Sequence, residues 1–348
     1  MYSLRNDKLE KLSYSGTTSQ LLMKISNLKG QQTLFERQSP EILEELKKVA
    51  VIQSTEASNS IEGIVVPNKR LKELMDEKVA PEDRSEAEIA GYRDVLETIH
   101  ISAEGIPVKP GVIKQLHGDL MQYATSSGGK WKSTDNYIEE KLESGETRIR
   151  FRPIEAWKTE DAMEELCTLY NKKKEIGAVP DLVLVASFVL DFLSIHPFSD
   201  GNGRMARLLT LLLLYHFDYQ VGKFISIEKV IEETKEQYYE TLYISSQGWH
   251  EGEHDLTPWV DYFLTVILKS YSLFAERVGT VKEYKRGWKE ERIRNVVMQT
   301  VGDLKVSQIE EKCPGISRAT IQRVLKKLQT EGSLECIGAG RSAKWRKK

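Results

Sequence analysis

The sequence predicts a mainly α-helical protein that carries one β-hairpin and ends in a small separate module. Three observations predict this class. Apolar residues recur near a 3.6-residue period through most of the chain, one apolar run is long enough for a fully buried helix, and one central segment alternates apolar and polar residues instead. The chain has 348 residues, 40% hydrophobic and 29% charged, which is enough for two or three domains with hydrophobic cores.

Four segments carry the clearest helical patterns. The segments 41–53, 85–100 and 158–171 alternate apolar and charged residues near the helical period, which is typical of amphipathic helices. The segment 182–193 is apolar on nearly all sides, which indicates a helix in the centre of a bundle. Such a helix would hold the residues that follow it on a rigid support.

Residues 130–153 break the helical pattern. Tyr137-Ile138 and the alternating segment 147–151 flank a polar turn that contains glycine, which predicts a β-hairpin. Arg148, Arg150 and Arg152 alternate along its second half. Without a ligand, this would be a surface hairpin whose arginines are only solvated.

Residues 196–207 combine the groups that transfer of a nucleotide phosphate requires, in the order His-Pro-Phe-Ser-Asp-Gly-Asn-Gly-Arg-Met-Ala-Arg. Gly201 and Gly203 let the backbone approach an oxyanion at the start of the apolar segment that follows. Unpaired N–H groups and the helix dipole favour anions there. Arg204 and Arg207 lie three residues apart, so on a helix both guanidinium groups project toward the same polyanion.

Asp200 and His196 supply the remaining groups. The carboxylate of Asp200 stands just before the glycines, where it can hold a Mg²⁺ ion that bridges phosphates. His196 is the general base nearest to them, and a neutral imidazole accepts a proton from a hydroxyl near neutral pH. A turn and a solvated helix would explain any one of these residues alone, but the joint spacing favours the catalytic interpretation.

These twelve residues resemble the signature of the Fic-domain family, His-x-Phe-x-Asp/Glu-Gly-Asn-Gly-Arg-x-x-Arg, at every defining position. The resemblance implies a Fic-type helical bundle in which the hairpin is a flap that binds a target backbone as an added strand. It also implies transfer of AMP from ATP to a Ser, Thr or Tyr hydroxyl of a target protein or of the chain itself. Gly203 favours AMP transfer over kinase activity, because a relative with Lys there is a kinase. Transfer of another phosphate-containing group, such as phosphocholine, stays open.

The resemblance also implies a role for each residue. His196 would deprotonate the target hydroxyl, Asp200 would bind Mg²⁺, and Phe198 would anchor the loop in the core. Tyr238 and Tyr239, on an expected helix, are candidates for the adenine pocket, although aromatic residues at helical spacing more often belong to a core. The residues assigned to the ATP site are Phe198, Gly201, Asn202, Gly203, Arg204, Arg207, Tyr238 and Tyr239.

A second motif lies upstream, where residues 58–63 read Ser-Asn-Ser-Ile-Glu-Gly. Ser58 and Glu62 are one helical turn apart and Gly63 can cap the helix, although such a pair also arises by chance. The motif is similar to the family's inhibitory motif Ser/Thr-x-x-x-Glu-Gly/Asn, so we expect an inhibitory helix around residues 54–63. If Glu62 pairs with Arg207, its carboxylate takes the place of the γ-phosphate, and ATP binds in a non-productive pose.

The last sixty residues have the pattern of a separate domain. Helices are expected at 291–301 and 306–313 and after the N-cap Ser317, and 334–337 and 343–345 would be two strands. This order resembles a winged helix-turn-helix, and nine Lys or Arg stand against two Glu from Ser317 onward. Such domains bind DNA, other proteins or a second copy of the chain. The candidates for contacts with DNA are Arg318, Thr320, Gln322 and Arg323.

These assignments divide the chain into an N-terminal helical region (1–100), a catalytic core (101–275) with the flap (130–153), a linker (276–289) and the winged helix domain (290–348). No apolar run reaches the ~18 residues of a membrane span, and the first residues lack a signal segment. We therefore expect a cytoplasmic protein without a membrane partner. Three scattered cysteines fit a reducing compartment: Cys167, Cys313 and Cys336.

Residues 250–254 match the zinc-protease pattern His-Glu-x-x-His, which binds zinc only when both histidines share a helix face. Gly248 and Gly252 favour a loop, so no zinc site is expected. His117 and His216 lie among apolar residues and are expected to be packed or capping groups.

The main alternative function is a DNA-binding regulator in which the same fold senses a nucleotide without useful turnover. The intact signature argues against it, because a sensor does not need His196 as a base. The expected small-molecule requirements are ATP as substrate and Mg²⁺. The sequence does not reveal the target, the modified side chain, the DNA sequence or whether the chain forms a homodimer.

Overall fold

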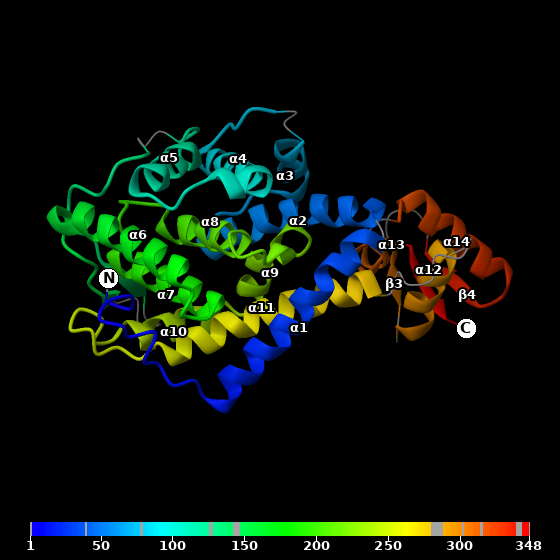
Figure 1. The fold of residues 1–348 in the computed structure, drawn as a ribbon. Helices are drawn as coiled ribbons and strands as arrows, with labels where there is room; N and C mark the ends of the chain where they lie inside the picture. The colour runs from blue at the N-terminus through cyan, green and yellow to red at the C-terminus, as the bar shows by residue number, and fades with distance from the viewer. Residues whose placement is uncertain are drawn as a thin grey trace. The chain divides into compact units, whose positions relative to one another are not determined.

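The structure is a computed structural model, and its described residues are 2–38, 40–76, 79–124, 128–141, 147–279, 288–300, 303–313, 316–338 and 343–347. They are mostly helical, with two small antiparallel sheets (Figure 1). The chain divides into two compact units, the first made of Met1–Thr33 and Val49–Phe274 and the second of Leu34–Lys48 and Ala275–Lys348. The predicted mainly α-helical class is confirmed.

The helices that lie wholly or partly in the first unit are α1 (Gly16–Gln38), α2 (Pro40–Ile61), α3 (Asn68–Met75), α4 (Arg84–Ser102), α5 (Pro110–Leu120), α6 (Thr159–Ile176), α7 (Asp181–Ile195), α8 (Asn202–Tyr215), α9 (Ile227–Glu233), α10 (Lys235–Ser246) and α11 (Thr257–Gly279). Short 3₁₀ turns lie at Ala103–Gly105, Ala156–Lys158 and Gln220–Lys223. None of the helices in the described ranges combines the length and the apolar character needed to cross a membrane.

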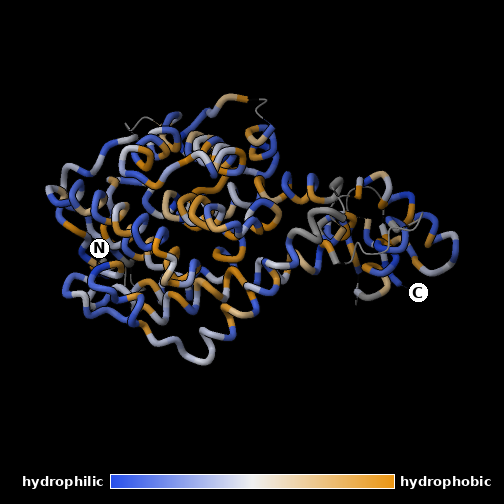
Figure 2. The backbone as a smooth tube through the Cα atoms, viewed as in Figure 1, coloured by the Kyte–Doolittle hydropathy of each residue, from blue (hydrophilic) through white to orange (hydrophobic). Residues whose placement is uncertain are grey.

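Helices α7 and α8 form the buried centre of the first unit. Every residue from Leu182 to Ile195 is buried, as the apolar pattern of this segment predicts. Every residue of α8 is buried except Gly203, which is half-buried. Helix α7 packs between α6 and α8, and α4 packs on α8. Figure 2 shows hydrophobic residues gathering in the interior of this unit. The two central helices therefore give a rigid support to the residues between them.

The predicted β-hairpin is present in the first unit. Strands β1 (Ile138–Lys141) and β2 (Thr147–Phe151) pair antiparallel, with Glu139 opposite Ile149 and an irregular register after Ile138. The turn at 142–146 lies outside the described residues. The strands follow the alternation of polar and apolar residues that distinguishes this segment from its helical surroundings.

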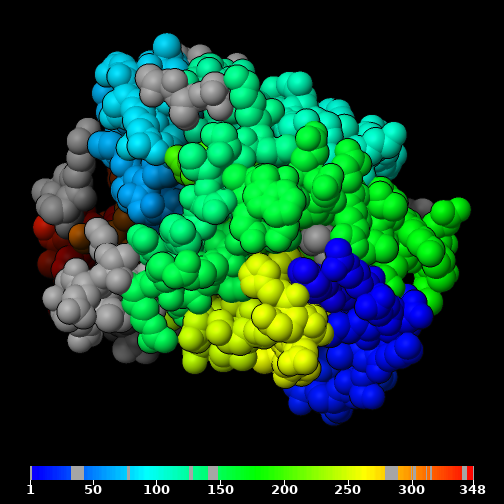
Figure 3. Space-filling view, turned by 90° about the vertical axis from the view of Figure 1, so that its left-hand side faces the viewer, coloured from blue at the N-terminus to red at the C-terminus, as the bar shows by residue number. Residues whose placement is uncertain are grey.

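Figure 3 shows the N-terminal residues, in blue, lying beside the yellow residues around position 250. The amine of Lys8 donates hydrogen bonds to the carbonyl oxygens of Gly252 and His254. Ser3 is fully buried, and its backbone and side chain bond to Asp191 of α7. The N-terminal segment is therefore packed into the helical unit.

The second unit contains a winged helix-turn-helix made of α12 (Trp288–Gln299), β3 (Leu304–Lys305), α13 (Val306–Lys312), α14 (Arg318–Thr330), β4 (Leu334–Ile337) and β5 (Lys344–Lys347). Strand β5 lies between β3 and β4. Ser317 caps α14 as predicted, because its hydroxyl oxygen accepts a hydrogen bond from the Thr320 N–H. Strand β3 was not predicted, since two residues are too few to form a recognisable pattern.

The segment 276–289, predicted as a linker, is partly helical. Residues 276–279 form the end of α11, and residues 288–289 form the start of α12. Residues 280–287 lie outside the described residues.

Candidate active site

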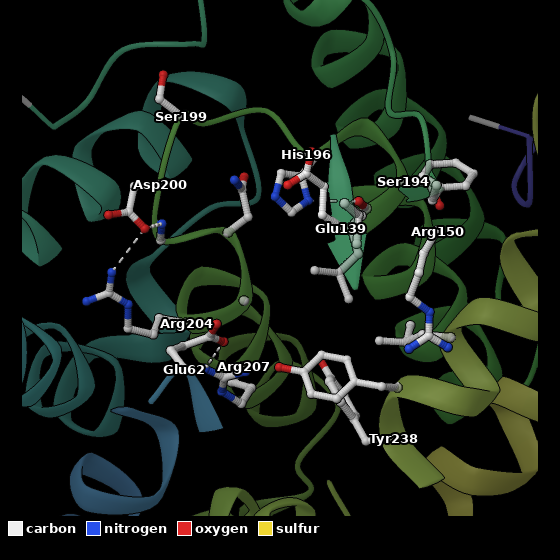
Figure 4. Close-up of a pocket in the computed structure, with 18 of the residues that line it drawn as sticks. Glu62, Glu139, Arg150, Ser194, His196, Ser199, Asp200, Arg204, Arg207 and Tyr238 are labelled. Carbon is white, nitrogen blue, oxygen red and sulfur yellow. Dashed lines mark hydrogen bonds and ion pairs between the residues drawn. The ribbon is translucent and has the colours of Figure 1, made fainter. Parts of the chain in front are cut away.

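A cavity of about 610 Å³ lies where α7 ends and α8 begins (Figure 4). It brings together side chains that are far apart in the sequence. The end of α2, the start of α4, the hairpin and α10 complete its walls. The residues that line it include Glu62, Arg84, Glu88, Arg150, His196, Asp200, Arg204, Arg207, Tyr238 and Tyr239.

His196 follows the last residue of α7 and has a left-handed backbone, with φ 50°. This conformation is uncommon for a residue with a side chain and turns the imidazole into the cavity. Its Nδ1 lies 3.3 Å from the carbonyl oxygen of Leu193, which assigns the proton to Nδ1 and leaves a lone pair on Nε2. Burial lowers the pKa of His196 to about 4, so the ring is neutral at pH 7 and can act as a base.

The loop after His196 is anchored by Phe198 and His117. The Phe198 ring is fully buried and stacks on the His117 ring, with 3.7 Å between their centroids. Nδ1 of His117 accepts a hydrogen bond from the Gly129 N–H, so Nε2 carries the proton and donates to the Asp200 carbonyl oxygen at 3.1 Å. Burial lowers the pKa of His117 to about 4. His117 is thus a packed group, as predicted, that holds the signature loop.

The amide of Asn202 is engaged inside the same loop. Its Oδ1 accepts from the Phe198 N–H at 2.9 Å, and its Nδ2 donates to the Phe198 carbonyl oxygen at 2.7 Å. In this structure the Asn202 side chain closes the loop, and its assignment to the ATP site stays a prediction.

Two more residues, neither of which was predicted from the sequence, support the loop from outside. The side-chain amide of Asn136 donates hydrogen bonds to the carbonyl oxygens of His196 and Phe198. The amine of Lys132 donates a hydrogen bond to the carbonyl oxygen of Ile195. Both come from the irregular segment before the hairpin, about sixty residues upstream, where no local pattern marks them.

The two glycines of the loop meet different requirements. Gly201 has φ 78°, in the left-handed region that glycine adopts without strain, and it precedes the first residue of α8. At Gly203, an added Cβ would overlap with Oε1 of Glu62. The first glycine therefore allows the turn into α8, and the second leaves room for a carboxylate from another helix.

Arg207 is almost fully buried and binds the end of α2. Its Nε donates to the Ser58 hydroxyl, and its Nη2 donates to the Ser58 carbonyl oxygen and to Oε1 of Glu62, each at 2.8 Å. Gly63, with φ 82°, follows Glu62 and donates its N–H to the Ser60 carbonyl oxygen, so it ends the helix as expected. Figure 4 shows Glu62 facing Arg207. Within the described part of the chain, Nη1 of Arg207 has no hydrogen-bond partner.

Arg204 belongs to a ring of four charged side chains. Its Nη1 lies 2.6 Å from Oε2 of Glu88, and its Nη2 lies 3.5 Å from Oδ1 of Asp200. Arg84 closes the ring, with Nε 2.6 Å from Oε1 of Glu88 and Nη2 2.9 Å from Oδ2 of Asp200. Arg84 and Glu88 were not predicted as site residues. Their spacing of four residues on α4 is a local signal, but many surface helices carry such pairs.

Tyr238 and Tyr239 both line the cavity from α10. Tyr238 is buried, and its ring meets that of Tyr239 edge to face at 5.2 Å. From the hairpin, the guanidinium of Arg150 lies 4.8 Å from the ring centre of Tyr243, on the same helix. This part of the cavity is therefore aromatic, whereas the part at the N-terminus of α8 is highly charged.

The His-Glu-Gly-Glu-His segment lies between α10 and α11 and is not helical. Nε2 of His250 hydrogen-bonds to the Arg152 carbonyl oxygen, whereas Nε2 of His254 hydrogen-bonds to the Ser3 hydroxyl. The two rings thus serve separate contacts. His216 hydrogen-bonds to the Ala103 carbonyl oxygen. Across the described ranges, no group of three or more His, Cys, Asp or Glu residues could hold a metal ion.

In the second unit, helix α14 presents the residues proposed to contact DNA. Arg318, Gln322 and Arg323 are exposed, and Thr320 is half-buried. Arg318 also forms an ion pair with Glu310 of α13 at 2.9 Å. The apolar residues of α14 face inward, where Ile321 and Leu325 are fully buried.

Comparisons with known proteins agree with this geometry. The profile of the Fic/DOC family matches residues 107–214, and that of the C-terminal domain of DIP2311-like transcriptional regulators matches residues 291–348. The chain is 30% identical over 116 residues to a Fido domain-containing protein of Dictyostelium discoideum, which covers 33% of this chain and 74% of that protein.

Two solved structures share the fold. One is a Fic family protein from Desulfovibrio desulfuricans G20, with a TM-score of 0.63, 20% identity and 97% of each chain covered. The other is a Fic domain-containing signaling protein from Bacteroides thetaiotaomicron, with a TM-score of 0.61, 22% identity and coverage of 78% of this chain and 100% of that one. The signature loop, the cavity and these matches together show that the chain belongs to the Fic/DOC family.

Proposed function

We propose that this protein is an adenylyltransferase that transfers AMP from ATP to a hydroxyl group of a target protein or of itself. One observation carries the proposal. A neutral His196 with a lone pair on Nε2 shares a cavity with the N-terminus of α8 and two buried arginines, Arg204 and Arg207. A base and a polyanion site in one cavity are the two requirements of nucleotidyl transfer.

The phosphates of ATP would lie at the N-terminus of α8. The backbone N–H groups there and the positive end of the helix dipole favour anions. Nη1 of Arg207 is a buried donor that a phosphate oxygen can satisfy. The adenine would lie toward the aromatic wall formed by Tyr238 and Tyr239.

Asp200 is the residue that would hold Mg²⁺. Its carboxylate is 46% exposed and lines the cavity beside the start of α8. Mg²⁺ usually keeps several waters and takes one or two carboxylates together with substrate phosphates, which fits this donor set. When bound, the ion supplies charge neutralisation to the phosphates and to the pyrophosphate that leaves.

In the proposed reaction, Nε2 of His196 accepts the proton of the target hydroxyl. The hydroxyl oxygen forms a bond to the α-phosphorus, and the bond from that phosphorus to the bridging oxygen breaks. Pyrophosphate leaves with the bonding electron pair, and the proton passes from His196 to solvent afterwards. The hydrogen bond from Nδ1 to the Leu193 carbonyl oxygen keeps the ring oriented and stabilises the imidazolium that forms.

Glu62 would keep this enzyme in a weakly active state. Its carboxylate already neutralises Arg207 and lies against Gly203, where the backbone would approach a phosphate. Like charges repel, so the last phosphate of ATP cannot share this position with Glu62. ATP would then bind with its α-phosphate misaligned for attack.

The intact mass of Glu62→Gly protein, after incubation with ATP and Mg²⁺, tests this function. We expect a gain of one or more AMP units, and no gain in the Glu62→Gly/His196→Ala protein. A search for AMP on proteins of a cell extract extends the test to external targets. If neither the protein nor the extract gains AMP, adenylyl transfer is refuted, and a gain of a different mass from another donor would identify a different transferred group.

A second function, DNA binding, is supported by the exposed face of α14 and by the match to a transcriptional-regulator domain. We expect the full-length protein to bind duplex DNA with an affinity that falls as salt is raised. Replacing Arg323 by Ala should weaken this binding. Equal binding by the wild-type and Arg323→Ala proteins would favour a role for this domain in contacts with proteins.

A further inference from the structure

The ring of four charges at the phosphate end of the cavity has two sides with different exposure. Arg204 and Glu88 are buried, with side chains 2% and 3% exposed. Arg84 and Asp200 lie at the rim, with side chains 75% and 46% exposed. Charges alternate around the ring, so every carboxylate contacts two guanidinium groups.

The buried ion pair, Arg204 with Glu88, and the exposed ion pair, Arg84 with Asp200, differ in how easily they break. Breaking a buried ion pair leaves a desolvated charge, so the contact between Arg204 and Glu88 is expected to persist in every state of the site. An exposed pair is weak and exchanges readily with water and ions. The contact between Arg84 and Asp200 is therefore the side of the ring that can open.

We propose that Arg84 is an exchangeable counter-ion of Asp200, which occupies the place of the divalent cation and gives way when the cation binds. The inference rests on the proposed function, because it takes Asp200 as the carboxylate that holds Mg²⁺. The 2.9 Å contact of Nη2 with Oδ2 puts positive charge on the carboxylate oxygen that is free of Arg204. One oxygen cannot accept a close contact from a guanidinium and a metal ion along the same direction.

Glu88 keeps Arg84 at the cavity when this contact opens. Nε of Arg84 lies 2.6 Å from Oε1 of Glu88, one turn further along α4, and this bond does not involve Asp200. The opened guanidinium would stay at the rim. Without Mg²⁺, the same residue neutralises Asp200 and reduces its repulsion of phosphates. Arg84 thus strengthens nucleotide binding when Mg²⁺ is absent and competes with the ion when it is present. Both effects lower the dependence of nucleotide binding on the metal.

Binding of ADP, measured by calorimetry with MgCl₂ and with EDTA, tests the proposal without relying on AMP transfer. The measured quantity is the Mg²⁺ enhancement, which is the Kd in EDTA divided by the Kd in MgCl₂. We expect Arg84→Gln to raise this enhancement about five-fold, since removal of an exposed ion pair releases the competition for Asp200. We expect Asp200→Asn to abolish the enhancement.

The matched control is Arg150→Gln, which removes the same charge from the same cavity. Figure 4 places Arg150 on the other side of the cavity from Asp200. The control should leave the enhancement at the wild-type value. An equal rise in both variants would overturn the proposal, because it would show a general effect of charge.

The remaining outcomes distinguish a wrong role for Arg84 from a wrong nucleotide site. An enhancement that depends on Asp200 but is unchanged in Arg84→Gln would overturn the role of Arg84 and leave the proposed function standing. Failure of ADP to bind in any variant would overturn the nucleotide site and the role of Arg84 with it. Unfolding temperatures of all variants, compared with the wild type, would identify any loss of fold.

Discussion

Nη2 of Arg207 lies 2.8 Å from Oε1 of Glu62, and this oxygen occupies the space that a Cβ on Gly203 would need. One carboxylate from the end of α2 therefore meets both the guanidinium and the backbone that would bind phosphates. The contact joins residues 145 positions apart. Together with the two hydrogen bonds from Arg207 to Ser58, it joins residues 58–63 to the signature loop.

Replacing Glu62 by Gly should raise the rate of AMP transfer. The variant frees Nη2 of Arg207, and a charge-assisted hydrogen bond contributes about 1.5–3 kcal/mol, so we expect a gain of about tenfold or more. Initial rates with ATP labelled at the α-phosphate measure it. The matched control is Glu56→Gly, which removes an exposed carboxylate from α2, the helix that ends just before Glu62. Unchanged rates in Glu62→Gly would contradict the inhibitory role.

Local patterns predicted the parts of the site that are contiguous in sequence. The spacing of Ser58, Glu62 and Gly63 indicated a helix end, and the glycines of the signature indicated a helix N-terminus. The meeting of Glu62 with Arg207 was expected only through the resemblance to the family. No periodic pattern specifies a contact between distant residues.

Residues that support the site from a distance could not be predicted. Arg84 and Glu88 have the spacing of an ordinary surface pair, and only the fold brings Asp200 to them. Ser3 and Asp191 are separated by 188 positions, and a serine near the start of a chain gives no signal of burial. Such partners depend on tertiary packing, which sequence periodicity does not encode.

Replacing Gly203 by Ala should destabilise the protein only while Glu62 is present. The new Cβ would overlap with Oε1 of Glu62, whereas in a Glu62→Gly background it would gain the helix propensity of alanine. We expect a coupling of about 1–3 kcal/mol between the two substitutions, measured by urea unfolding of both single variants and the double variant. Equal costs in both backgrounds would show that Glu62 does not restrict this position.

The pH dependence of AMP transfer should report the lowered pKa of His196. Burial holds this pKa at about 4, so the imidazole is neutral and able to accept a proton from pH 8 down to about pH 5. The rate of the Glu62→Gly protein should be flat over that range and fall below it. Loss of the Glu62 charge, which raises this pKa, can only move the fall to lower pH. A fall centred near pH 6.5 would show an unperturbed histidine.

His117 should make the protein less stable in mild acid. Its pKa is about 4 in the folded state and about 6.5 when unfolded, so the unfolded state binds more protons between these values. The contribution of His117 to the free energy of unfolding is therefore fully present above pH 6.5 and is lost as the pH falls toward 4. The loss from pH 7 to pH 5 is about 2 kcal/mol for this group. Urea unfolding at both pH values should show a smaller pH dependence in His117→Gln than in the wild type.

The N-terminal segment should stabilise the hairpin through Asp191. This fully buried carboxylate accepts hydrogen bonds from the hydroxyl of Ser3 and from Nε1 of Trp249, each at 2.6 Å. The ring of His250, next to Trp249, stacks on Phe151 of β2 with 5.5 Å between centroids. A chain of contacts therefore links the N-terminal segment to β2, the strand that lines the cavity.

Replacing Asp191 by Ala leaves the Ser3 and Trp249 donors without their acceptor inside the core, which should cost about 2–4 kcal/mol. Hydrogen exchange should become faster at the amide of Phe151 as well. The control is Asp261→Ala, which removes a single hydrogen bond, from the Thr18 hydroxyl. If Asp191→Ala destabilised the protein without any change in exchange at Phe151, the segment would support the helical unit but not the hairpin. Faster exchange at Phe151 in Asp191→Ala and not in the control would show that a contact between residues 188 positions apart stabilises β2, the strand that lines the cavity.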